Sequence, residues 1–404
     1  MMKVLVLAPR PLSPAHDGGT VATLRCIIGL AEAGARVTVL SMMTEKHRYG
    51  ADTPGERKPD ILDEYRTVSV NTSVRPLSLL LNLAFSRKPF DLERFRSREY
   101  SSALREILAA GSYDIIHCEG LVYALYLDEI QSLTTAPVIL RAHNLEHRIR
   151  GMMASKERST LRRFYLADLS RRLKRLEKYA ASQFDAIVPI NGPDSDWFSS
   201  AAEGKQMFLC PTGADEVSYI PEPVDAPPRV GFLGSMTWQP NLDGIRWFIE
   251  SVWPLVLNEI PAATLHLAGR GLSGVRASLP AGRNISFEGE PDDARTFIGS
   301  NHVMISPLFA GSGLRIKIIE AMSAGRPVVA TPVAAEGIDA AAEYGLTLAA
   351  DAGAFCTAVV KYLENPELRS TSGKAAVRLV GERYENRTLT AGLLEFYRRI
   401  AHDS

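Results

Sequence analysis

Residues 306–331 read SPLFAGSGLRIKIIEAMSAGRPVVAT, and this stretch decides the fold. An apolar run at 302–306 ends like a buried strand, and the small residues at 310–313 form a tight loop. The spacing of apolar residues at 314–323 predicts a helix, and 327–331 is a second apolar strand. A strand, a loop, a helix and a strand in this order indicate a parallel α/β sheet.

The glycine loop is placed to bind an anion. Backbone N–H groups at the start of a helix have no partner inside the helix, and together with the helix dipole they attract negative charge. Arg315 adds a positive charge suited to phosphate oxygens, and Glu320, deeper in the helix, could accept hydrogen bonds from ribose hydroxyls. Gly325 is placed to end the helix. An ordinary crossover with a small-residue turn has the same pattern, because glycine motifs are weak by themselves.

The stretch resembles the donor-site motif of retaining glycosyltransferases of family 4, which have the GT-B fold. That motif has two glutamates separated by seven residues, then Ala-Met, a small pair and Gly-x-Pro-Val-Val-Ala-Thr. Glu320 matches the second glutamate, which in the family holds the ribose of the sugar nucleotide, whereas the first glutamate falls at Ser312. The sequence Gly-Ser-Gly-Leu-Arg-Ile-Lys at 311–317 resembles that of a bacterial branch of the family associated with exopolysaccharide gene systems. The resemblance is weak in the N-terminal half and strong from Gly231 to Ile338.

Length and composition limit the classes of protein to which this chain can belong. The 404 residues suggest two domains, and 46 Lys and Arg balance 46 Asp and Glu, so no global charge argues for nucleic acid. The four cysteines are far apart, lack metal-ligand spacing and are typical of a reduced cytosolic protein. The N-terminal apolar run is too short for a signal peptide, and no window approaches a membrane span. We expect a cytoplasmic protein that could lie at the inner face of the cell membrane.

The first half alternates strands and helices. After the apolar strand 3–8, a proline-rich loop leads to Gly18 and Gly19 and to a helix that ends near Gly34. This unit lacks the Gly-x-Gly-x-x-Gly of dinucleotide-binding folds. The resemblance places a Gly-Gly loop at the cleft near the transferred sugar, whereas a plain turn is the other interpretation. Further strands are predicted at 37–41, 113–118, 138–141, 184–190 and 208–210.

The second half repeats the alternation after 211–228, a linker candidate with five prolines. Strands are predicted at 229–233, 264–268 and 285–287, and helices at 241–258, 352–364, 372–382 and near the C-terminus, where Leu389, Leu393, Phe396, Tyr397 and Ile400 mark one face. We therefore expect an α/β protein of GT-B fold, with two Rossmann-like doubly wound parallel-sheet domains facing a central cleft. The expected division is an acceptor-side domain at 1–212, a nucleotide-sugar-binding domain at 213–383 and a C-terminal helix, 384–404, that crosses back to the first domain.

Glycosyl transfer from a sugar nucleotide must stabilise a departing pyrophosphate and an oxocarbenium-like sugar. Family members commonly carry an Arg and a Lys in the loop that here is 234–241, and this loop has no basic residue. Arg315 and Lys317 are the nearest substitutes, with Arg270 as a further candidate. We favour Arg315, since residues two apart on a helix diverge and both reach one pyrophosphate only if Arg315 precedes the helix. The donor-binding candidates are Gly18, Gly19, Gly234, Ser235, Arg270, Glu290, Ser312, Gly313, Leu314 and Glu320.

His143 is the third catalytic candidate, beside Arg315 and Lys317. It follows a strand, and in related enzymes a histidine there lies near the donor sugar or acceptor, although a histidine that merely bonds a loop is the other interpretation. His117 is a weaker candidate, and Asp17 and Glu119 could be acceptor-side carboxylates. No metal motif is present, and GT-B enzymes typically need no bound metal. We expect no cofactor, only a nucleotide-diphosphate sugar as co-substrate, UDP- or GDP-linked.

Two segments could contact an anionic membrane. Residues 75–98 are apolar with basic flanks, although a helix packed on its own domain is the commoner outcome. Residues 141–178 hold twelve Lys or Arg against four acids, a net charge of +8. They include a predicted helix, 155–181, with an apolar face of Leu161, Tyr165, Leu169, Leu173 and Leu176. Such a run is usually solvated, but it could attract anionic lipid or a phosphorylated acceptor.

Three functions remain open. The first is a retaining, metal-independent glycosyltransferase that moves a sugar from a nucleotide diphosphate to a glycan or glycolipid acceptor in bacterial polysaccharide or glycoconjugate synthesis. The second is a GT-B sugar-nucleotide epimerase, which would need general-base carboxylates. The third is a catalytically silent scaffold that binds nucleotide or a partner protein, and Ser312 in place of the first glutamate keeps it open.

Overall fold

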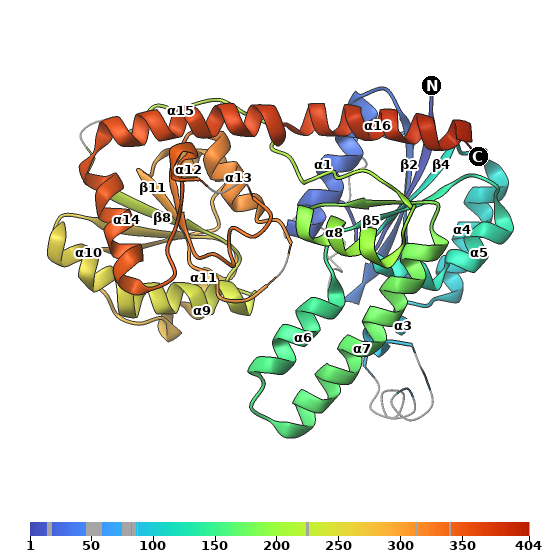
Figure 1. The fold of residues 1–404 in the computed structure, drawn as a ribbon, viewed down its shortest axis with the longest axis horizontal. Helices are drawn as coiled ribbons and strands as arrows, with labels where there is room; N and C mark the ends of the chain where they lie inside the picture. Colours follow the sequence, from blue (N-terminus) through green and yellow to red (C-terminus); the bar gives the residue numbers. More distant parts are fainter. Residues whose placement is uncertain are drawn as a thin grey trace. The chain divides into compact units, whose positions relative to one another are not determined.

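The computed structural model describes residues 1–13, 18–45, 59–74, 82, 86, 88–223, 226–311, 313–338 and 341–403. The chain forms two compact units (Figure 1). Unit 1 comprises Met1–Thr212 and Asn386–Ser404, and unit 2 comprises Gly213–Glu385. Each is built around one parallel sheet with helices, which confirms the predicted α/β architecture of two Rossmann-like units.

Unit 1 has a seven-stranded parallel sheet in the order β3-β2-β1-β4-β5-β6-β7. The strands are β1 Lys3–Ala8, β2 Arg36–Thr44, β3 Glu64–Val70, β4 Ile115–Glu119, β5 Val138–Ala142, β6 Ala186–Pro189 and β7 Gln206–Met207. Every residue of β4 and β5 is buried, as expected for central strands covered on both faces.

The helices of unit 1 cover the two faces of this sheet. They are α1 Gly18–Glu32, α3 Phe90–Glu93, α4 Arg98–Ala110, α5 Leu127–Leu133, α6 Glu146–Lys156, α7 Thr160–Gln183, α8 Gly192–Ala201 and α16 Asn386–Asp403, with the 3₁₀ turn η2 Leu121–Leu125. Side chains of β1 alternate between two cores. Val4 and Val6 pack with α1 and α16, and Leu5 and Leu7 pack in the core that includes α4.

Unit 2 has a six-stranded parallel sheet in the order β10-β9-β8-β11-β12-β13. The strands are β8 Arg229–Leu233, β9 Thr264–Ala268, β10 Ile285–Gly289, β11 Val303–Ser306, β12 Val328–Ala330 and β13 Leu346–Leu348. The helices are α9 Gln239–Trp247, α10 Trp253–Glu259, α11 Leu272–Val275, α12 Ala294–Gly299, α13 Ile316–Ser323, α14 Ala352–Glu364 and α15 Pro366–Arg383, with the short turns η3 Phe248–Val252, η4 Arg276–Ser278 and η5 Ala342–Tyr344.

The opening stretch folds as predicted, with small shifts. β11, α13 and β12 follow one another, and Gly325, at φ 75°, closes α13 while Arg326 N–H donates to Ala321 O at 2.9 Å. The predicted helix 241–258 is α9 and α10 joined by the π-helical turn η3. Pro254, which has no amide hydrogen to donate one turn back, follows this wider turn.

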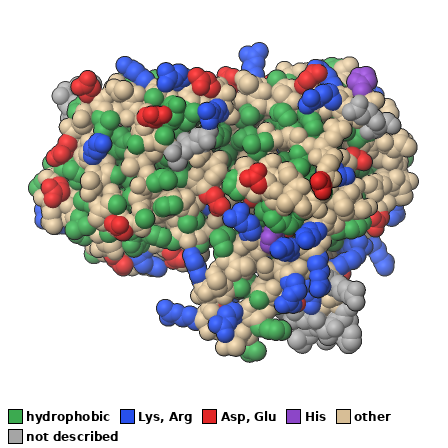
Figure 2. Space-filling view, viewed as in Figure 1, with side chains coloured by type: hydrophobic (Ala, Val, Ile, Leu, Met, Phe, Trp, Pro, Cys, Tyr) green, Lys and Arg blue, Asp and Glu red, His purple; other side chains and the backbone are tan. Residues whose placement is uncertain are grey.

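The long helix predicted at 155–181 is divided in the structure. α6 ends at Lys156 and α7 begins at Thr160, and between them Ser159 N–H donates to Glu157 Oε1 at 2.9 Å. The two helices form a hairpin that extends beyond the sheet of unit 1 (Figure 1) and carries many of the Lys and Arg side chains visible on that face (Figure 2). Leu161, on the predicted apolar face, is 84% exposed, whereas Leu169 and Leu173 on the same face are buried.

The proline-rich segment 211–228 was predicted as a linker, but its described residues up to Pro221 lie along unit 2. Ser218 N–H and Ile220 N–H donate to the carbonyls of Ser323 and Ala324, each at 3.1 Å. The buried Arg326 guanidinium donates to Ile220 O, Pro221 O and Gly299 O at 2.8–2.9 Å. Four of these hydrogen bonds fix the segment to the end of α13, and the fifth joins Arg326 to the end of α12.

Three further differences concern unit 1. The strand predicted at 208–210 is assigned two residues earlier as β7, although Phe208 N–H and Cys210 N–H still donate to Ile187 O and Pro189 O beside β6. The edge strand β3 was not predicted. In the segment 75–98, residues 75–81, 83–85 and 87 lie outside the described residues. None of the described helices is long and apolar enough to cross a membrane.

Candidate functional site

Three loops meet at the carboxyl ends of β8, β9 and β11 in unit 2, which is where parallel α/β sheets place ligands. The loop after β8 lies against the loop after β9. Gly234 N–H donates to Ala268 O at 3.0 Å, and Met236 N–H donates to Arg270 O at 2.8 Å. Gly269 has φ 135°, and a Cβ there would lie 2.1 Å from Gly234 O, so only glycine permits this approach.

Arg315 lies in the turn that leads into α13. Its backbone is extended and it caps a helix that begins at Ile316, two residues later than predicted. The side chain is 9% exposed, and its guanidinium carbon lies 5.5 Å from the centre of the Trp238 ring. Burial lowers the pKa of Arg315 to about 10, with Glu336 opposing the change, so the group stays charged at neutral pH. Arg315 thus precedes the helix, which is the position required if Arg315 and Lys317 are to reach one pyrophosphate.

Lys317, in the first turn of α13, connects the helix to the loop after β8. Its Nζ donates to Asn241 Oδ1 at 2.9 Å and lies 4.5 Å from the centre of the Phe232 ring. Asn241 Nδ2 in turn donates to Ser235 O at 2.8 Å. Burial, and then the charge of Arg315, lower the pKa of Lys317 to about 7. Arg315 and Lys317 therefore both contact the 235–241 segment, which itself has no basic residue.

The other donor-binding candidates of unit 2 lie in the loops that follow β8, β9, β10 and β11 and in α13. Gly234 and Ser235 belong to the loop after β8, where Ser235 Oγ lies 2.8 Å from Thr237 Oγ1. Arg270 follows β9, and its Nε is buried without a hydrogen-bond partner among the described residues. The remaining positions are Gly313 at φ 86°, the buried Leu314, the half-buried Glu320 within α13 and the exposed Glu290 after β10. Ser312 lies outside the described residues.

Gly18 and Gly19 belong to unit 1, where they are exposed at the start of α1; Asp17 lies outside the described residues. His143 and Glu119 are also in unit 1, at the carboxyl ends of β5 and β4. The structure therefore brings Arg315, Lys317 and their neighbours together in unit 2, and His143 and Glu119 together in unit 1.

Glu119 is the centre of a buried polar network in unit 1. Its carboxylate accepts hydrogen bonds from His143 Nε2, from His117 Nε2 at 2.9 Å, from Thr23 Oγ1 at 3.3 Å and from Arg141 Nη1 at 3.4 Å. Burial alone would raise the pKa of Glu119, but Arg141, His143 and His117 outweigh it and hold the pKa well below its usual range. Glu119 is therefore a fully partnered carboxylate that orients His143.

The network continues into the C-terminal helix. Tyr397 Oη, on α16, lies 2.5 Å from His117 Nδ1, so the hydroxyl can donate to a ring whose other nitrogen donates to Glu119. Tyr397 is buried, and burial raises its pKa well above the usual range, so it remains a donor. The sequence had marked Tyr397 only as an apolar helix face and had not singled out Arg141. The available signal was a set of charged and polar residues within strands that are otherwise wholly apolar.

One group of possible metal ligands occurs among the described residues. Cys26, His117 and Glu119 offer ligand atoms within 4.8 Å of one another, and all three are buried. Both ring nitrogens of His117 already have hydrogen-bond partners, and Arg141 places a positive charge beside the carboxylate. Burial also raises the pKa of the Cys26 thiol, which disfavours the thiolate that a metal requires. The donor set fits a hydrogen-bonded network better than a metal ion.

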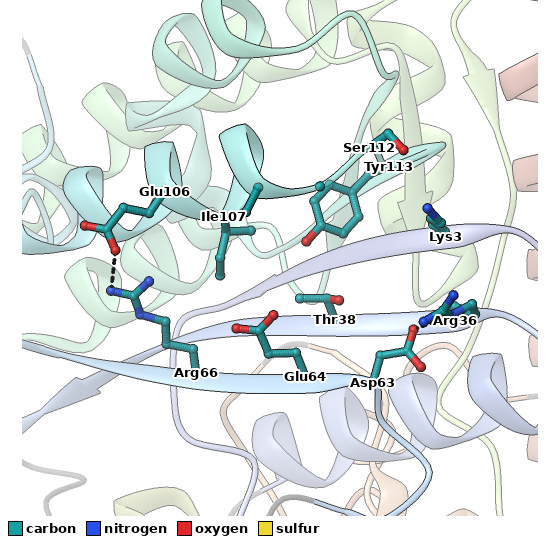
Figure 3. A pocket seen from close by; sticks show the side chains of 12 residues that line it. Lys3, Arg36, Thr38, Asp63, Glu64, Arg66, Glu106, Ile107, Ser112 and Tyr113 are labelled. Carbon is teal, nitrogen blue, oxygen red and sulfur yellow. Dashed lines mark hydrogen bonds and ion pairs between the residues drawn. The ribbon is translucent and has the colours of Figure 1, made fainter.

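A hollow of about 450 Å³ opens at the opposite edge of the unit 1 sheet, near the amino ends of β1 to β3 (Figure 3). Four of the charged side chains that line it form two ion pairs. Arg36 pairs with Asp63 at 2.7 Å and Arg66 with Glu106 at 2.8 Å. These pairs stabilise the edge strand β3, and the hollow lies away from the carboxyl ends of the strands, so we assign it no catalytic role.

Residues 227–365 match the family of glycosyl transferases group 1. This match lies wholly within the second unit, so unit 2 resembles a group 1 glycosyltransferase domain. The chain is 23% identical to an uncharacterized 44.6 kDa protein in the cps region of Klebsiella pneumoniae, over 98% of this chain and 100% of that protein. It is 25% identical to phosphatidyl-myo-inositol mannosyltransferase of Mycobacterium tuberculosis, over 74% of this chain and 77% of that one.

Solved structures of glycosyltransferases share the fold of both units. Sucrose-phosphate synthase from Thermosynechococcus elongatus superposes with a TM-score of 0.74 at 18% identity, covering 100% of each chain. HepE from Anabaena, solved in complex with UDP-glucose, superposes with a TM-score of 0.63 at 13% identity, covering 100% of this chain and 99% of that one. The two Rossmann-like units therefore have the GT-B fold.

Proposed function

We propose that this protein transfers a sugar from a nucleotide-diphosphate sugar to a glycan or lipid-linked acceptor, with retention of configuration and without a bound metal. The observation that carries the proposal is that Arg315, in the turn after β11, and Lys317, in the first turn of α13, both contact the segment that follows β8. A departing pyrophosphate needs positive charge held in place before the reaction begins. Because both cations are packed against neighbouring side chains, little reorganisation is needed when negative charge develops.

The nucleotide is proposed to lie on the same unit. Glu320, one turn into α13, is the candidate acceptor for the ribose hydroxyls, and the turn 313–315 is proposed to offer backbone N–H groups to the phosphates. Gly234, Ser235, Arg270 and Glu290 are proposed to complete the donor site. UDP is the nucleotide favoured for a first experiment, because the structurally similar HepE was solved with UDP-glucose. GDP remains the second choice.

The acceptor is proposed to be a glycan or a glycolipid of bacterial polysaccharide or glycoconjugate synthesis. Two relatives support this class: one is a protein of a cps region, and the other is a mannosyltransferase that acts on phosphatidyl-myo-inositol by name. His143 is proposed as the catalytic candidate of unit 1, held in place by Glu119.

The proposal is tested by incubating the protein with UDP-, GDP-, dTDP- and ADP-sugars, first without an acceptor. Slow release of free sugar supports a transferase, and NMR of the first transfer product reads the anomeric configuration. An epimerised sugar nucleotide would instead support an epimerase, and binding without turnover would support a silent scaffold. Activity that survives chelation by EDTA supports metal independence. Arg276→Ala, an exposed arginine of unit 2 that lies over Phe287, is the matched control for Arg315→Ala.

A further inference from the structure

The tip of the α6–α7 hairpin exposes large apolar side chains. Leu161 is 84% exposed, Phe164 is 75% exposed and Met153 is 45% exposed. Leu161 and Phe164 are three residues apart on α7 and therefore share one face of the helix. Apolar residues scattered singly over a protein surface need no explanation, but a group at the end of one projecting element marks an interaction site.

Poor packing does not explain this exposure, because the base of the hairpin is fixed. His147 Nδ1 pairs with the buried Glu177 carboxylate, which also accepts from His147 N–H at 3.3 Å. Ser170 Oγ donates to His147 O at 2.8 Å. Leu169 is the first buried residue of α7, and Tyr165, one turn earlier, still packs partly against the core, so residues 160–164 extend the helix roughly 7 Å past the core. A rigid element thus presents an apolar tip.

Positive charge surrounds the apolar tip. Between Met153 and Phe164 there are four basic residues, Lys156, Arg158, Arg162 and Arg163, against one acid, Glu157. All four basic residues are exposed, and Arg162 and Glu157 are 3.8 Å apart, a weak surface pair. Arg158 and Arg163 have no ion-pair partner in the described part of the chain. The wider segment 141–178 has a net charge of +8.

We propose that the hairpin tip docks on an anionic phospholipid bilayer, with Leu161 and Phe164 inserted at the headgroup level and the surrounding arginines paired with lipid phosphates. Apolar side chains ringed by Lys and Arg are the combination that binds anionic membrane surfaces. Charge argues against a symmetric contact between the hairpin tips of two copies, since both tips would carry the same positive charge. The inference does not rest on sugar transfer, because membrane binding is measured without donor or acceptor.

The test is co-sedimentation of the full chain with vesicles of phosphatidylcholine alone or with an equimolar share of phosphatidylglycerol. We expect binding only to the anionic vesicles, and we expect it to weaken steeply as salt is added. Leu161→Ser with Phe164→Ser should weaken binding by about tenfold or more, because two apolar side chains no longer leave water. Both positions are exposed, so folding should be unaffected. Leu255→Ser, at an exposed leucine of α10, is the control and should bind as the wild type does.

Three results would overturn the inference. They are no binding to anionic vesicles at low salt, equal binding to neutral vesicles, and full binding by the double variant. Self-association in sedimentation equilibrium that the double variant abolishes would assign the tip to a second copy instead. A separate readout is Phe164→Trp, whose added fluorescence should be quenched by brominated phospholipid in anionic vesicles, whereas Leu255→Trp should not be quenched.

Discussion

Lys317 Nζ lies 2.9 Å from Asn241 Oδ1, and this contact joins helix α13 to the first turn of α9, seventy-six positions earlier in the chain and directly after the loop that follows β8. The loop carries no basic residue of its own, so the pairing brings a positive charge to it from α13. Asn241 also holds Ser235 O, which fixes the loop at its other end. The relationship explains how unit 2 can present two cations where the sequence of the loop has none.

The pH dependence of donor binding should report the charge on Lys317. Its pKa of about 7 means that the cation is lost as pH rises through neutrality in the free protein. Affinity for UDP-glucose should then fall by up to about tenfold per pH unit above this value. The diester pyrophosphate of the ligand does not titrate in this range. Calorimetry on wild type and Lys317→Met measures the slope, and an equal slope in both proteins would contradict the assignment.

Lys317 should also make the free energy of unfolding depend on pH. The pKa of Lys317 is lower in the folded chain than its ordinary value of 10.5, so the unfolded chain binds more protons between about pH 7 and 10.5. The contribution of Lys317 to the free energy of unfolding therefore increases with pH across this window. Urea unfolding of wild type and Lys317→Met should diverge in their pH dependence there, and parallel curves would show that the lysine is not desolvated.

Arg315→Ala should lower the turnover rate by about 10²–10³, as for loss of one preorganised donor, and raise the donor's Michaelis constant less. The reason is that negative charge on the leaving pyrophosphate grows as the sugar–oxygen bond breaks. Arg315→Lys should recover only part, because a point charge cannot hold two oxygens in a fork. Steady-state kinetics measure both, with Arg276→Ala as control. If Arg315→Ala and Lys317→Ala each leave the rate unchanged, the pyrophosphate is held elsewhere, and Arg270 becomes the candidate.

Local sequence predicted the parts of the fold that local forces determine. The bounds of β8 and β9 agree with the apolar runs 229–233 and 264–268, since buried parallel strands are nearly continuous in apolar residues. The strand β3 was missed because it lies at the sheet edge and alternates polar with apolar side chains. Leu161 lies on the predicted apolar face but is exposed, because the apolar periodicity of the helix continues past the point where its packing partner ends.

The sequence allowed candidate residues of the site to be named, but it did not predict which of them contact one another. Arg315 was found because it sits beside a glycine loop, a local pattern. The link from Lys317 to Asn241 depends on two segments far apart in sequence, and no spacing rule predicts it. The network around Glu119 also depends on segments far apart in sequence, since Tyr397 reaches His117 only because α16 packs on the sheet of unit 1.

Glu320→Ala should weaken nucleotide binding by roughly 1.5–3 kcal/mol, through the loss of charge-assisted hydrogen bonds to the ribose. Calorimetry with UDP measures the difference, and 2′-deoxy-UDP supplies a matched ligand. If Glu320 binds the 2′-hydroxyl, the variant should discriminate less between the two ligands than the wild type does. Unchanged affinity for both ligands would place the ribose elsewhere.

Glu119→Ala should destabilise unit 1 by about 3–5 kcal/mol, because it leaves the Arg141 charge buried without its carboxylate. The pKa of Glu119 is held well below its usual range, so its contribution to stability is present above the unfolded value and is lost as pH falls through the folded value. Urea unfolding measures both effects. Glu395→Ala, an exposed glutamate that pairs with Arg398 at 2.9 Å on α16, should change stability by less than about 1 kcal/mol.

His143→Ala should lower turnover by about 10² or more while leaving nucleotide affinity unchanged, if His143 acts in the chemical step and the nucleotide lies on unit 2. Tyr397→Phe is the companion variant. It removes the hydroxyl that lies 2.5 Å from His117 Nδ1 but leaves the Glu119–His143 hydrogen bond in place. If the network serves only to hold His143, Tyr397→Phe should lower turnover far less than His143→Ala does, with little change in the Michaelis constant. Equal losses in the two variants would mean that α16 controls the site through Tyr397 itself, whereas full activity of His143→Ala would assign the histidine a purely structural role.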